Sequence, residues 1–295
     1  MPTKNFEIME RDREIFLDLL WFRYLTRSHI DFVYWRDTKS PRACQNRMKK
    51  LYDMDYVNKQ ENASSWHQNP KASKSDRVFS LTQKGFKYLQ GCPNIQIPEG
   101  LKPPEKEIRQ GHFDHRMRNY SFWFRMKRGV EESEDFKVSS YYTDNHKMSD
   151  NGQMRSKIAF SGGGVEVEPD GAFYLERNGK RHLCLVEIDL NNNKLANKFE
   201  KYVQASGSYR KTFQSLFGTE FPLYALLVIT TDETVIEKAI RDAPEKLKKR
   251  LLFTTFDEVE SFYKLVADDG LKKENILFDL KWKVDGGERS LAKKH

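Results

Sequence analysis

The chain has few of the features that mark secreted or membrane proteins. Its 295 residues include three cysteines, Cys44, Cys92 and Cys184, which lie far apart. An odd and scattered set of cysteines argues against a disulfide framework and against a zinc site. No apolar run approaches the roughly 18 residues of a membrane span, and no signal-peptide pattern opens the chain. We therefore expect a cytoplasmic protein with no membrane partner.

Acidic residues are scarce in the first part of the chain. Residues 1–130 hold 25 Lys and Arg against 15 Asp and Glu, a net charge of +10, whereas residues 131–295 hold 26 against 28, a net charge of −2. The whole chain is 38% hydrophobic and 32% charged, which is typical of a globular protein. A basic first part favours binding to nucleic acid, although a merely solvated surface also carries such charge.

Residues 1–90 show the pattern of a winged helix-turn-helix domain. Ser40 and Pro41 have the residue types of an N-cap and a first helical position, and Thr26 and Thr82 are candidate caps of two other helices. Apolar spacing and these caps predict helices at 8–22, 26–35, 40–54 and from 82, and strands at 56–59 and 77–81. Such a domain places its third helix in the major groove of double-stranded DNA.

The outward face of that third helix and the loop between the strands carry the candidate DNA-binding residues. Arg, Asn and Gln can make bidentate contacts with base edges, whereas lysines more often hold phosphates. The candidates are Arg42, Gln45, Asn46, Arg47, Lys49, Lys50, Lys71 and Lys74. The alternative is a winged helix that contacts another protein.

Residues 91–111 hold four prolines and little periodicity, which indicates a linker. A second domain then covers residues 112–295. Its periodicity predicts a helix at 112–128, a strand at 136–142, a polar glycine-rich loop at 145–164, a hairpin at 165–189, a helix at 193–210, a strand at 221–231, a helix broken at Pro244 and a strand at 251–256.

The hairpin at residues 165–189 carries acids that its turn would bring together. Asn-Gly at 178–179 is a strong signal for a two-residue turn, because both residues tolerate positive φ. Facing residues then have numbers that add up to 357, as 178 and 179 do, so Asp170 faces Glu187 and Glu168 faces Asp189. Alternation along a strand puts the four carboxylates on one face. A divalent cation, a lysine or solvent must neutralise them.

The residues around these acids resemble the PD-(D/E)xK motif of restriction-endonuclease-like nucleases: PDG at 169–171, VEID at 186–189 and then KFEKY. Together with LTRSHI, RACQNRMKKLYDMDYV, VFSLTQKG and His115, the chain is similar to the replication-relaxation family of plasmids and other mobile elements over most of residues 8–256. The resemblance implies an α/β (α+β) protein with an N-terminal winged helix-turn-helix and a C-terminal restriction-endonuclease-like αβββαβ domain.

In that fold an Asp and a Glu on adjacent strands bind Mg²⁺ or Mn²⁺, and Asp170 and Glu187 match these two acids. The main-chain carbonyl of Ile188 is a further candidate ligand. The third place of the motif should be a lysine, but here it is Asp189. Either Asp189 is a third metal ligand or the general base, or a lysine of the next helix takes the catalytic role: Lys194, Lys198 and Lys201 project from it.

Two functions stay open on this basis. The first is a Mg²⁺- or Mn²⁺-dependent DNA endonuclease, perhaps nicking, in plasmid replication or mobilisation. The second is a catalytically inactive DNA-binding accessory factor or transcriptional repressor, in which a lysine pairs permanently with the acids. Winged helices often act as dimers and nucleases of this fold often pair, so a homodimer and replication or mobilisation proteins are expected partners besides double-stranded DNA.

Overall fold

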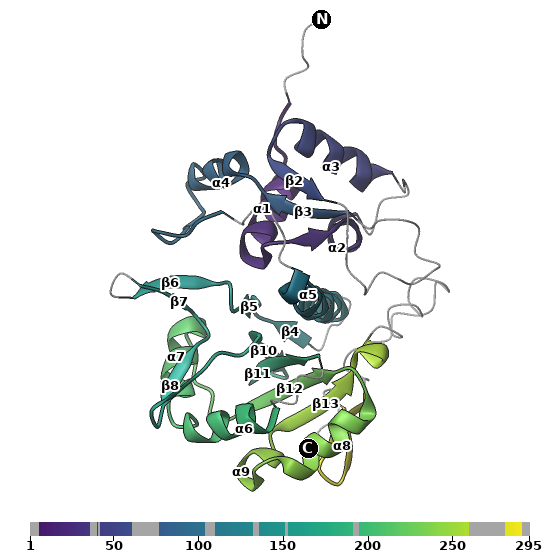
Figure 1. Cartoon of the computed structure of the whole chain (residues 1–295). Coiled ribbons are helices and arrows are strands. Elements are labelled where there is room, and N and C mark those ends of the chain that lie inside the picture. Colours follow the sequence, from purple (N-terminus) through teal and green to yellow (C-terminus); the bar gives the residue numbers. More distant parts are fainter. Residues whose placement is uncertain are drawn as a thin grey trace, which may run out of the picture. The chain divides into compact units, whose positions relative to one another are not determined.

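The computed structural model describes residues 6–35, 40, 42–60, 77–103, 110–131, 136–150, 153–190, 195–259 and 281–290. The chain divides into two compact units (Figure 1). The first comprises Met1–Met117 with Ser149–Met154, and the second comprises Arg118–Met148 with Arg155–His295. The domain limits expected from the sequence stay a prediction. Within the described ranges, no helix is long and apolar enough to cross a membrane.

The first unit contains a small sheet and helices in the order of a winged helix. Its elements are α1 (Glu10–Phe22), β1 (Leu25–Thr26), α2 (Arg27–Tyr34), α3 (Ala43–Asp53), β2 (Val57–Gln60), β3 (Val78–Leu81) and α4 (Gln83–Gln90). The sheet has the order β1-β3-β2, and both pairings are antiparallel. Buried residues of α1, among them Ile15, Phe16 and Leu19, form much of its core. The four predicted helices and the two predicted strands are present, whereas β1 was not predicted.

The capping residues explain where two of these helices begin. The Thr26 side chain accepts the main-chain N–H of His29, and the Thr82 side chain accepts that of Gly85, as expected of N-caps. The expected cap at Ser40 is wrong, because α3 begins only at Ala43, with Arg42 as its N-cap. The carbonyl of Ser40 accepts the Ala43 N–H at 3.1 Å, so this residue closes a turn before the helix. Pro41 lies outside the described residues.

A buried ion pair ties α3 to the start of α1. The Arg47 Nε donates to both carboxylate oxygens of Asp12, at 2.9 and 3.1 Å, and its Nη2 donates to the main-chain carbonyl of Glu7 at 2.8 Å. The side chain of Asp12 is only 1% exposed. The Arg47 guanidinium also lies over the ring of Phe6. Arg47 therefore links α3 to the start of α1 and to the residues before it.

The second unit is built on an eight-stranded sheet of order β15-β14-β13-β12-β11-β10-β4, with β5 also paired to β10. β11, β12 and β13 are parallel, and the other pairings of this sheet are antiparallel. The strands are β4 (Phe136–Val138), β5 (Tyr142–Thr143), β10 (Gly171–Arg177), β11 (Lys180–Asp189), β12 (Tyr224–Thr230), β13 (Leu251–Thr255), β14 (Lys281–Val284) and β15 (Gly287–Ser290). The helices are α5 (Gln110–Glu131), within which the two units divide, α6 (Leu195–Gln204), α7 (Tyr209–Phe217), α8 (Glu233–Asp242) and α9 (Glu245–Lys248).

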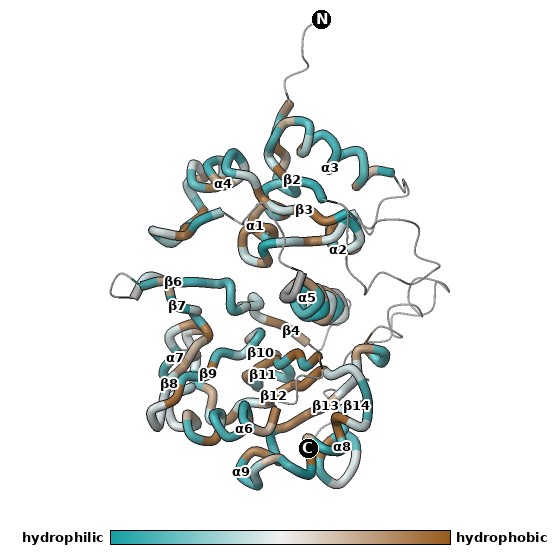
Figure 2. Tube along the Cα trace, viewed as in Figure 1, coloured by the Kyte–Doolittle hydropathy of each residue, from teal (hydrophilic) through white to brown (hydrophobic). Residues whose placement is uncertain are grey.

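Helices cover both faces of this sheet (Figure 1). On one face, Phe199 and Tyr202 of α6 and Ile236 of α8 belong to one buried cluster with apolar residues of β10 to β13. On the other face, Phe122 of α5 contacts Phe173 of β10 at a ring-centroid distance of 6.4 Å. Figure 2 shows hydrophobic residues concentrated on the central strands, as expected of a sheet buried on both faces.

Three expectations for the secondary structure of this unit are wrong. The strand expected at 136–142 is divided into β4 and β5, with residues 139–141 outside both. The expected loop at 145–164 contains most of two short two-stranded sheets, β6 (Lys147–Asp150) with β7 (Gln153–Ser156) and β8 (Phe160–Gly162) with β9 (Val165–Val167). Gly162 allows a close approach to the residue after α6, because a Cβ on Gly162 would lie 3.1 Å from the Cα of Ala205. The single helix expected at 193–210 ends at Gln204, and α7 follows as a separate helix.

We expect Arg47→Ala to destabilise the first unit by about 2–4 kcal/mol, because the change leaves the buried Asp12 carboxylate without its charge partner. Lys49→Ala is the matched control. It removes an exposed ion pair with Asp53 from the same helix and is expected to change the free energy of unfolding by less than about 0.5 kcal/mol. Thermal and urea unfolding of the two variants measure the difference. Equal stabilities would contradict the structural role of Arg47.

Candidate active site

The acidic hairpin has the register that its Asn-Gly turn predicts. Asn178 and Gly179 adopt φ angles of 50° and 73°, as both central residues of such a turn require. The pairs run from Arg177 opposite Lys180 to Gly171 opposite Val186. Asp170 directly precedes the strand, and its N–H donates to the carbonyl of Val186 at 3.0 Å. The ladder ends at Gly171, and this hydrogen bond is one residue out of step with it, so the expected facing pair of Asp170 and Glu187 lies just beyond the confirmed register.

Asp170 is anchored to the neighbouring strand by its side chain as well. The N–H of Ile188 donates to Oδ2 of Asp170 at 2.8 Å. The carboxylate thus lies across the end of β11 instead of extending into solvent, and the Asp170 side chain is 15% exposed. A charge-assisted hydrogen bond from a main-chain N–H both orients a carboxylate and stabilises its charge.

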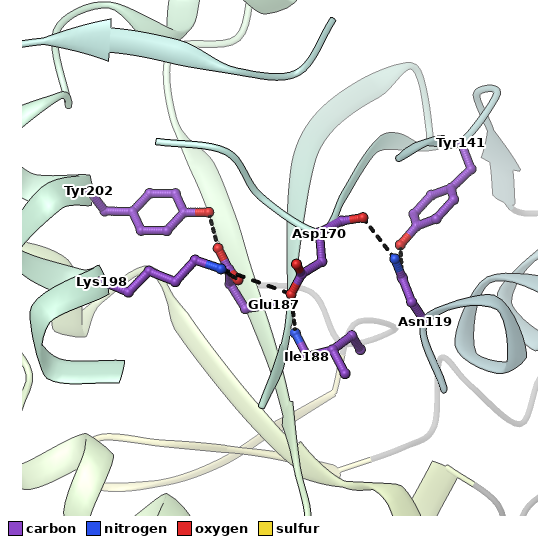
Figure 3. Close-up of polar contacts among 7 residues, drawn as sticks. All are labelled: Asn119, Tyr141, Asp170, Glu187, Ile188, Lys198 and Tyr202. Carbon is purple, nitrogen blue, oxygen red and sulfur yellow. Dashed lines mark hydrogen bonds and ion pairs between the residues drawn. The ribbon is translucent and has the colours of Figure 1, made fainter. Parts of the chain in front are cut away.

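Glu187 is buried and held by two side chains of α6 (Figure 3). Its side chain is 2% exposed. Lys198 donates to Oε2 of Glu187, and the Tyr202 hydroxyl donates to Oε1. The Lys198 Nζ also lies 4.0 Å from Oδ2 of Asp170, so one ammonium group serves both acids. Lys198 and Tyr202 are four residues apart and therefore lie on one face of the helix.

Burial governs the charge of this cluster. It raises the pKa of Glu187 to about 8, and the positive charge of Lys198 offsets only part of that effect. Burial also opposes the charge of Lys198, but the carboxylates of Glu187 and Asp170 outweigh it and raise the Lys198 pKa. Burial and the charge of Glu187 raise the pKa of Tyr202, so its hydroxyl keeps its proton and donates.

Two further residues support Asp170 from the opposite side, and sequence reasoning missed both. Asn119 of α5 donates its amide to the carbonyl of Asp170 at 2.7 Å, and the Tyr141 hydroxyl donates to the amide oxygen of Asn119. In Figure 3 they approach Asp170 from the side opposite Lys198 and Tyr202. The glycine of PDG was the available signal: a Cβ on Gly171 would lie 1.9 Å from the Tyr141 hydroxyl oxygen, so only glycine fits.

The other predicted catalytic residues occupy different places. Asp189 is 7% exposed at the end of β11, and strand alternation puts it on the same face as Glu187. Lys201 is exposed on α6, while Lys198 is the helix lysine that contacts both acids. Lys194 lies outside the described residues. A role of Asp189 or Lys201 in catalysis stays a prediction.

The expected pairing of Glu168 with Asp189 is wrong. The β10–β11 ladder ends at Gly171, and Glu168 follows the end of β9, which pairs with β8. Glu168 forms an ion pair with Lys147 instead, with 3.2 Å between the charged atoms. Lys198 therefore contacts two of the four acids, Asp170 and Glu187.

The donor set at Asp170 and Glu187 fits a hard divalent cation. Mg²⁺ is commonly bound through one or two carboxylates and keeps several waters. The ammonium group of Lys198, within ion-pair distance of both carboxylates, shows that they favour a cation in the same place. No group of three or more His, Cys, Asp or Glu side chains able to hold a metal ion occurs among the described residues. A site here would rest on the two carboxylates and on main-chain or water oxygens.

The predicted DNA-binding residues of α3 separate into two kinds. The side chains of one group are exposed along the helix: Arg42, Gln45, Asn46, Lys49 and Lys50. Arg47 differs, because its guanidinium is engaged by Asp12 and Glu7. Lys71 and Lys74 lie outside the described residues.

Comparison with known proteins assigns most of the chain to a family. The sequence profile of a family described as replication-relaxation matches residues 18–218, which is more than half of the chain. No curated protein and no solved structure matches the chain.

We expect Glu187 to make the stability of the protein pH-dependent. Because its folded-state pKa lies above the ordinary value of 4.5, its contribution to stability is fully present below pH 4.5 and is lost as the pH rises to about 8. Glu187→Gln, which cannot ionise, should flatten the decline of the unfolding temperature between pH 5 and pH 8. Glu168→Gln, at an exposed acid near the site, should keep the slope of the unaltered protein. Identical slopes in all three proteins would refute a raised Glu187 pKa.

Proposed function

The chain belongs to the replication-relaxation family, and from this premise we propose that it is a DNA-binding protein of a mobile element that cleaves DNA with Mg²⁺ or Mn²⁺. Family membership relates the chain to replication. The nuclease assignment adds a reaction, which is the hydrolysis of a phosphodiester, by nicking, during plasmid replication or mobilisation. The cluster of Asp170, Glu187 and Lys198 carries this proposal.

Asp170 and Glu187 would hold the metal ion, which when bound polarises the phosphodiester and activates water. Their place in the structure supports this role. Glu187 lies on β11, Asp170 directly precedes the adjacent antiparallel strand β10, and the main chain of Ile188 fixes Asp170. Rigid strands hold ligands more accurately than loops, so the acids are suited to a fixed coordination geometry.

Lys198 takes the role that the motif gives to a lysine on the strand. Its ammonium group lies beside both acids, whereas the strand position of the motif is occupied by Asp189. An ammonium at this place can orient the attacking water or stabilise the negative charge of the transition state. Tyr202 keeps its proton and holds Glu187 in place through its hydrogen bond.

The winged helix would bind the DNA substrate through α3. Its exposed polar side chains have the chemistry of base contacts at Arg42, Gln45 and Asn46, and of phosphate contacts at Lys49 and Lys50. Arg47 is left out of this surface, since its guanidinium binds Asp12.

The second candidate function is a DNA-binding accessory factor or repressor without cleavage. The observation that favours it is again Lys198. Its ion pairs with both acids already compensate their burial, so the cluster is stable without a metal ion. The two candidates share the winged helix and differ in whether the acids act on DNA.

We expect the purified protein to nick supercoiled plasmid DNA in the presence of Mn²⁺. Asp170→Asn and Glu187→Gln should each lower the rate roughly a hundred-fold or more, because each removes a carboxylate ligand. Lys198→Met should lower the rate by a similar factor, through the loss of charge in the transition state. Glu168→Gln is the control, and its rate should be unchanged. DNA left intact with Mn²⁺, or cut as fast by Asp170→Asn, would favour the non-cleaving function.

DNA binding is tested separately on α3. The probe is a DNA duplex selected from a random pool for binding to the unaltered protein. The double variant Arg42→Ala/Lys50→Ala should bind this duplex about ten-fold or more weakly. Asn46→Ala should lose preference for that duplex over a random one, since an amide reads base edges. Fluorescence anisotropy at fixed salt gives both values. Lys238→Ala, at an exposed lysine of α8, is the control. Binding that these α3 changes leave intact would exclude α3 as the DNA-reading helix.

A further inference from the structure

We propose that Asn119 is the positioning residue of the metal site: it holds the main chain at Asp170 so that the carboxylate stays opposite Glu187. This inference rests on the proposed function, and it assigns a role to α5, which carries neither of the acids. The two acids and Lys198 come from the β10–β11 hairpin and from α6, whereas Asn119 reaches the site from the other face of the sheet (Figure 3).

Asp170 needs such a support because it lies just outside the regular ladder. β10 begins at Gly171, and the preceding chain belongs to another sheet. Three contacts fix the residue: its N–H to the carbonyl of Val186, its Oδ2 from the N–H of Ile188, and its carbonyl from the amide of Asn119. The first two come from β11. The contact with Asn119 ties the main chain of Asp170 to α5.

Asn119 is itself held in one orientation. Its side chain is buried, with the residue 3% exposed, and its amide oxygen accepts the Tyr141 hydroxyl. An asparagine whose oxygen accepts from a tyrosine must present its NH₂ group elsewhere, and here that group meets the carbonyl of Asp170. Burial raises the pKa of Tyr141, so its hydroxyl remains a donor.

The tyrosine is in turn fixed by packing. Its ring stacks on Trp123, also from α5, with 4.6 Å between centroids and an interplanar angle of 9°. Its hydroxyl lies so close to Gly171 that no other residue fits after Asp170. Tyr141 thus contacts both Asn119 of α5 and Gly171 of the PDG turn, and its hydroxyl leaves no room for a side chain at Gly171.

A small displacement of Asp170 would break its contact with Lys198, the lysine that it shares with Glu187, because Lys198 Nζ already lies at the limit of ion-pair distance from it, 4.0 Å. Groups that orient metal ligands without touching the metal typically change metal affinity by about 10–100-fold when they are removed. Asn119 has the position of such a group.

The test is Mn²⁺ binding, followed by the loss of the free-ion electron paramagnetic resonance signal, in the full chain without DNA. Asn119→Asp keeps the shape and the acceptor for Tyr141 but replaces the donor to Asp170 with a carboxylate oxygen. We expect it to weaken Mn²⁺ binding about ten-fold or more. Tyr141→Phe keeps the ring stacking and removes only the hydroxyl, and it should weaken binding in the same direction by a smaller factor. The double variant should be no weaker than Asn119→Asp alone, because the two residues act in one path.

Asn145→Ala, at a partly buried asparagine in the turn after β5, is the matched control and should bind Mn²⁺ as the unaltered protein does. A merely structural role of Asn119 would lower the unfolding temperature and leave the Mn²⁺ affinity of the folded protein unchanged, which overturns the inference. If Asn119→Asp fails to fold, unaltered Mn²⁺ affinity in Tyr141→Phe overturns it equally. If Asp170→Asn also leaves Mn²⁺ binding intact, the proposed metal site itself is wrong, and the inference falls with it.

Discussion

The second unit is arranged around a buried carboxylate. Glu187 lies on a central strand with only 2% of its side chain exposed, and a charged group in such a place requires partners. Lys198 and Tyr202 supply them from one face of α6, and the buried Phe199 packs between them into the core. The helix is therefore oriented on the sheet by an ion pair and by apolar packing together. Removing either partner of Glu187 would leave part of this buried charge uncompensated.

The decisive part of this geometry could be predicted from two letters of the sequence. An Asn-Gly pair flanked by strand residues fixes the turn, the turn fixes the register as far as Gly171 opposite Val186, and Asp170 and Glu187 follow directly at the end of that ladder. The caps at Thr26 and Thr82 were predictable for a similar reason, since each is a local hydrogen bond between residues three apart. Signals of this kind depend on a few neighbouring residues and need no knowledge of the rest of the fold.

What could not be predicted depends on contacts between distant residues. The pairing of the hairpin does not continue before Asp170, because β9 pairs with β8 instead. No residue near Glu168 indicates this change of partner in the sequence. Arg47 has the sequence context of a DNA contact, but its partner Asp12 is 35 residues away. The same holds for Asn119, whose importance appears only when α5 is placed against the PDG turn, 51 residues further on. The roles of Arg47 and Asn119, two polar residues in helices, could thus not be predicted from their neighbours in the sequence.

The position of the lysine shows why a strict motif is a poor guide to this site. A lysine at position 189 would project from the strand on the same face as Glu187, and α6 covers that face, so either element can bring an ammonium group to the acids. The helix position differs in one physical respect. Lys198 is 33% exposed, whereas Glu187 is buried and Asp170 is fixed by main-chain hydrogen bonds. The acids are the rigid part of the cluster, and the cation is the part that reaches solvent. The ammonium group of Lys198 can therefore move away while the carboxylates stay in place. Binding of a metal ion between the carboxylates would require this property.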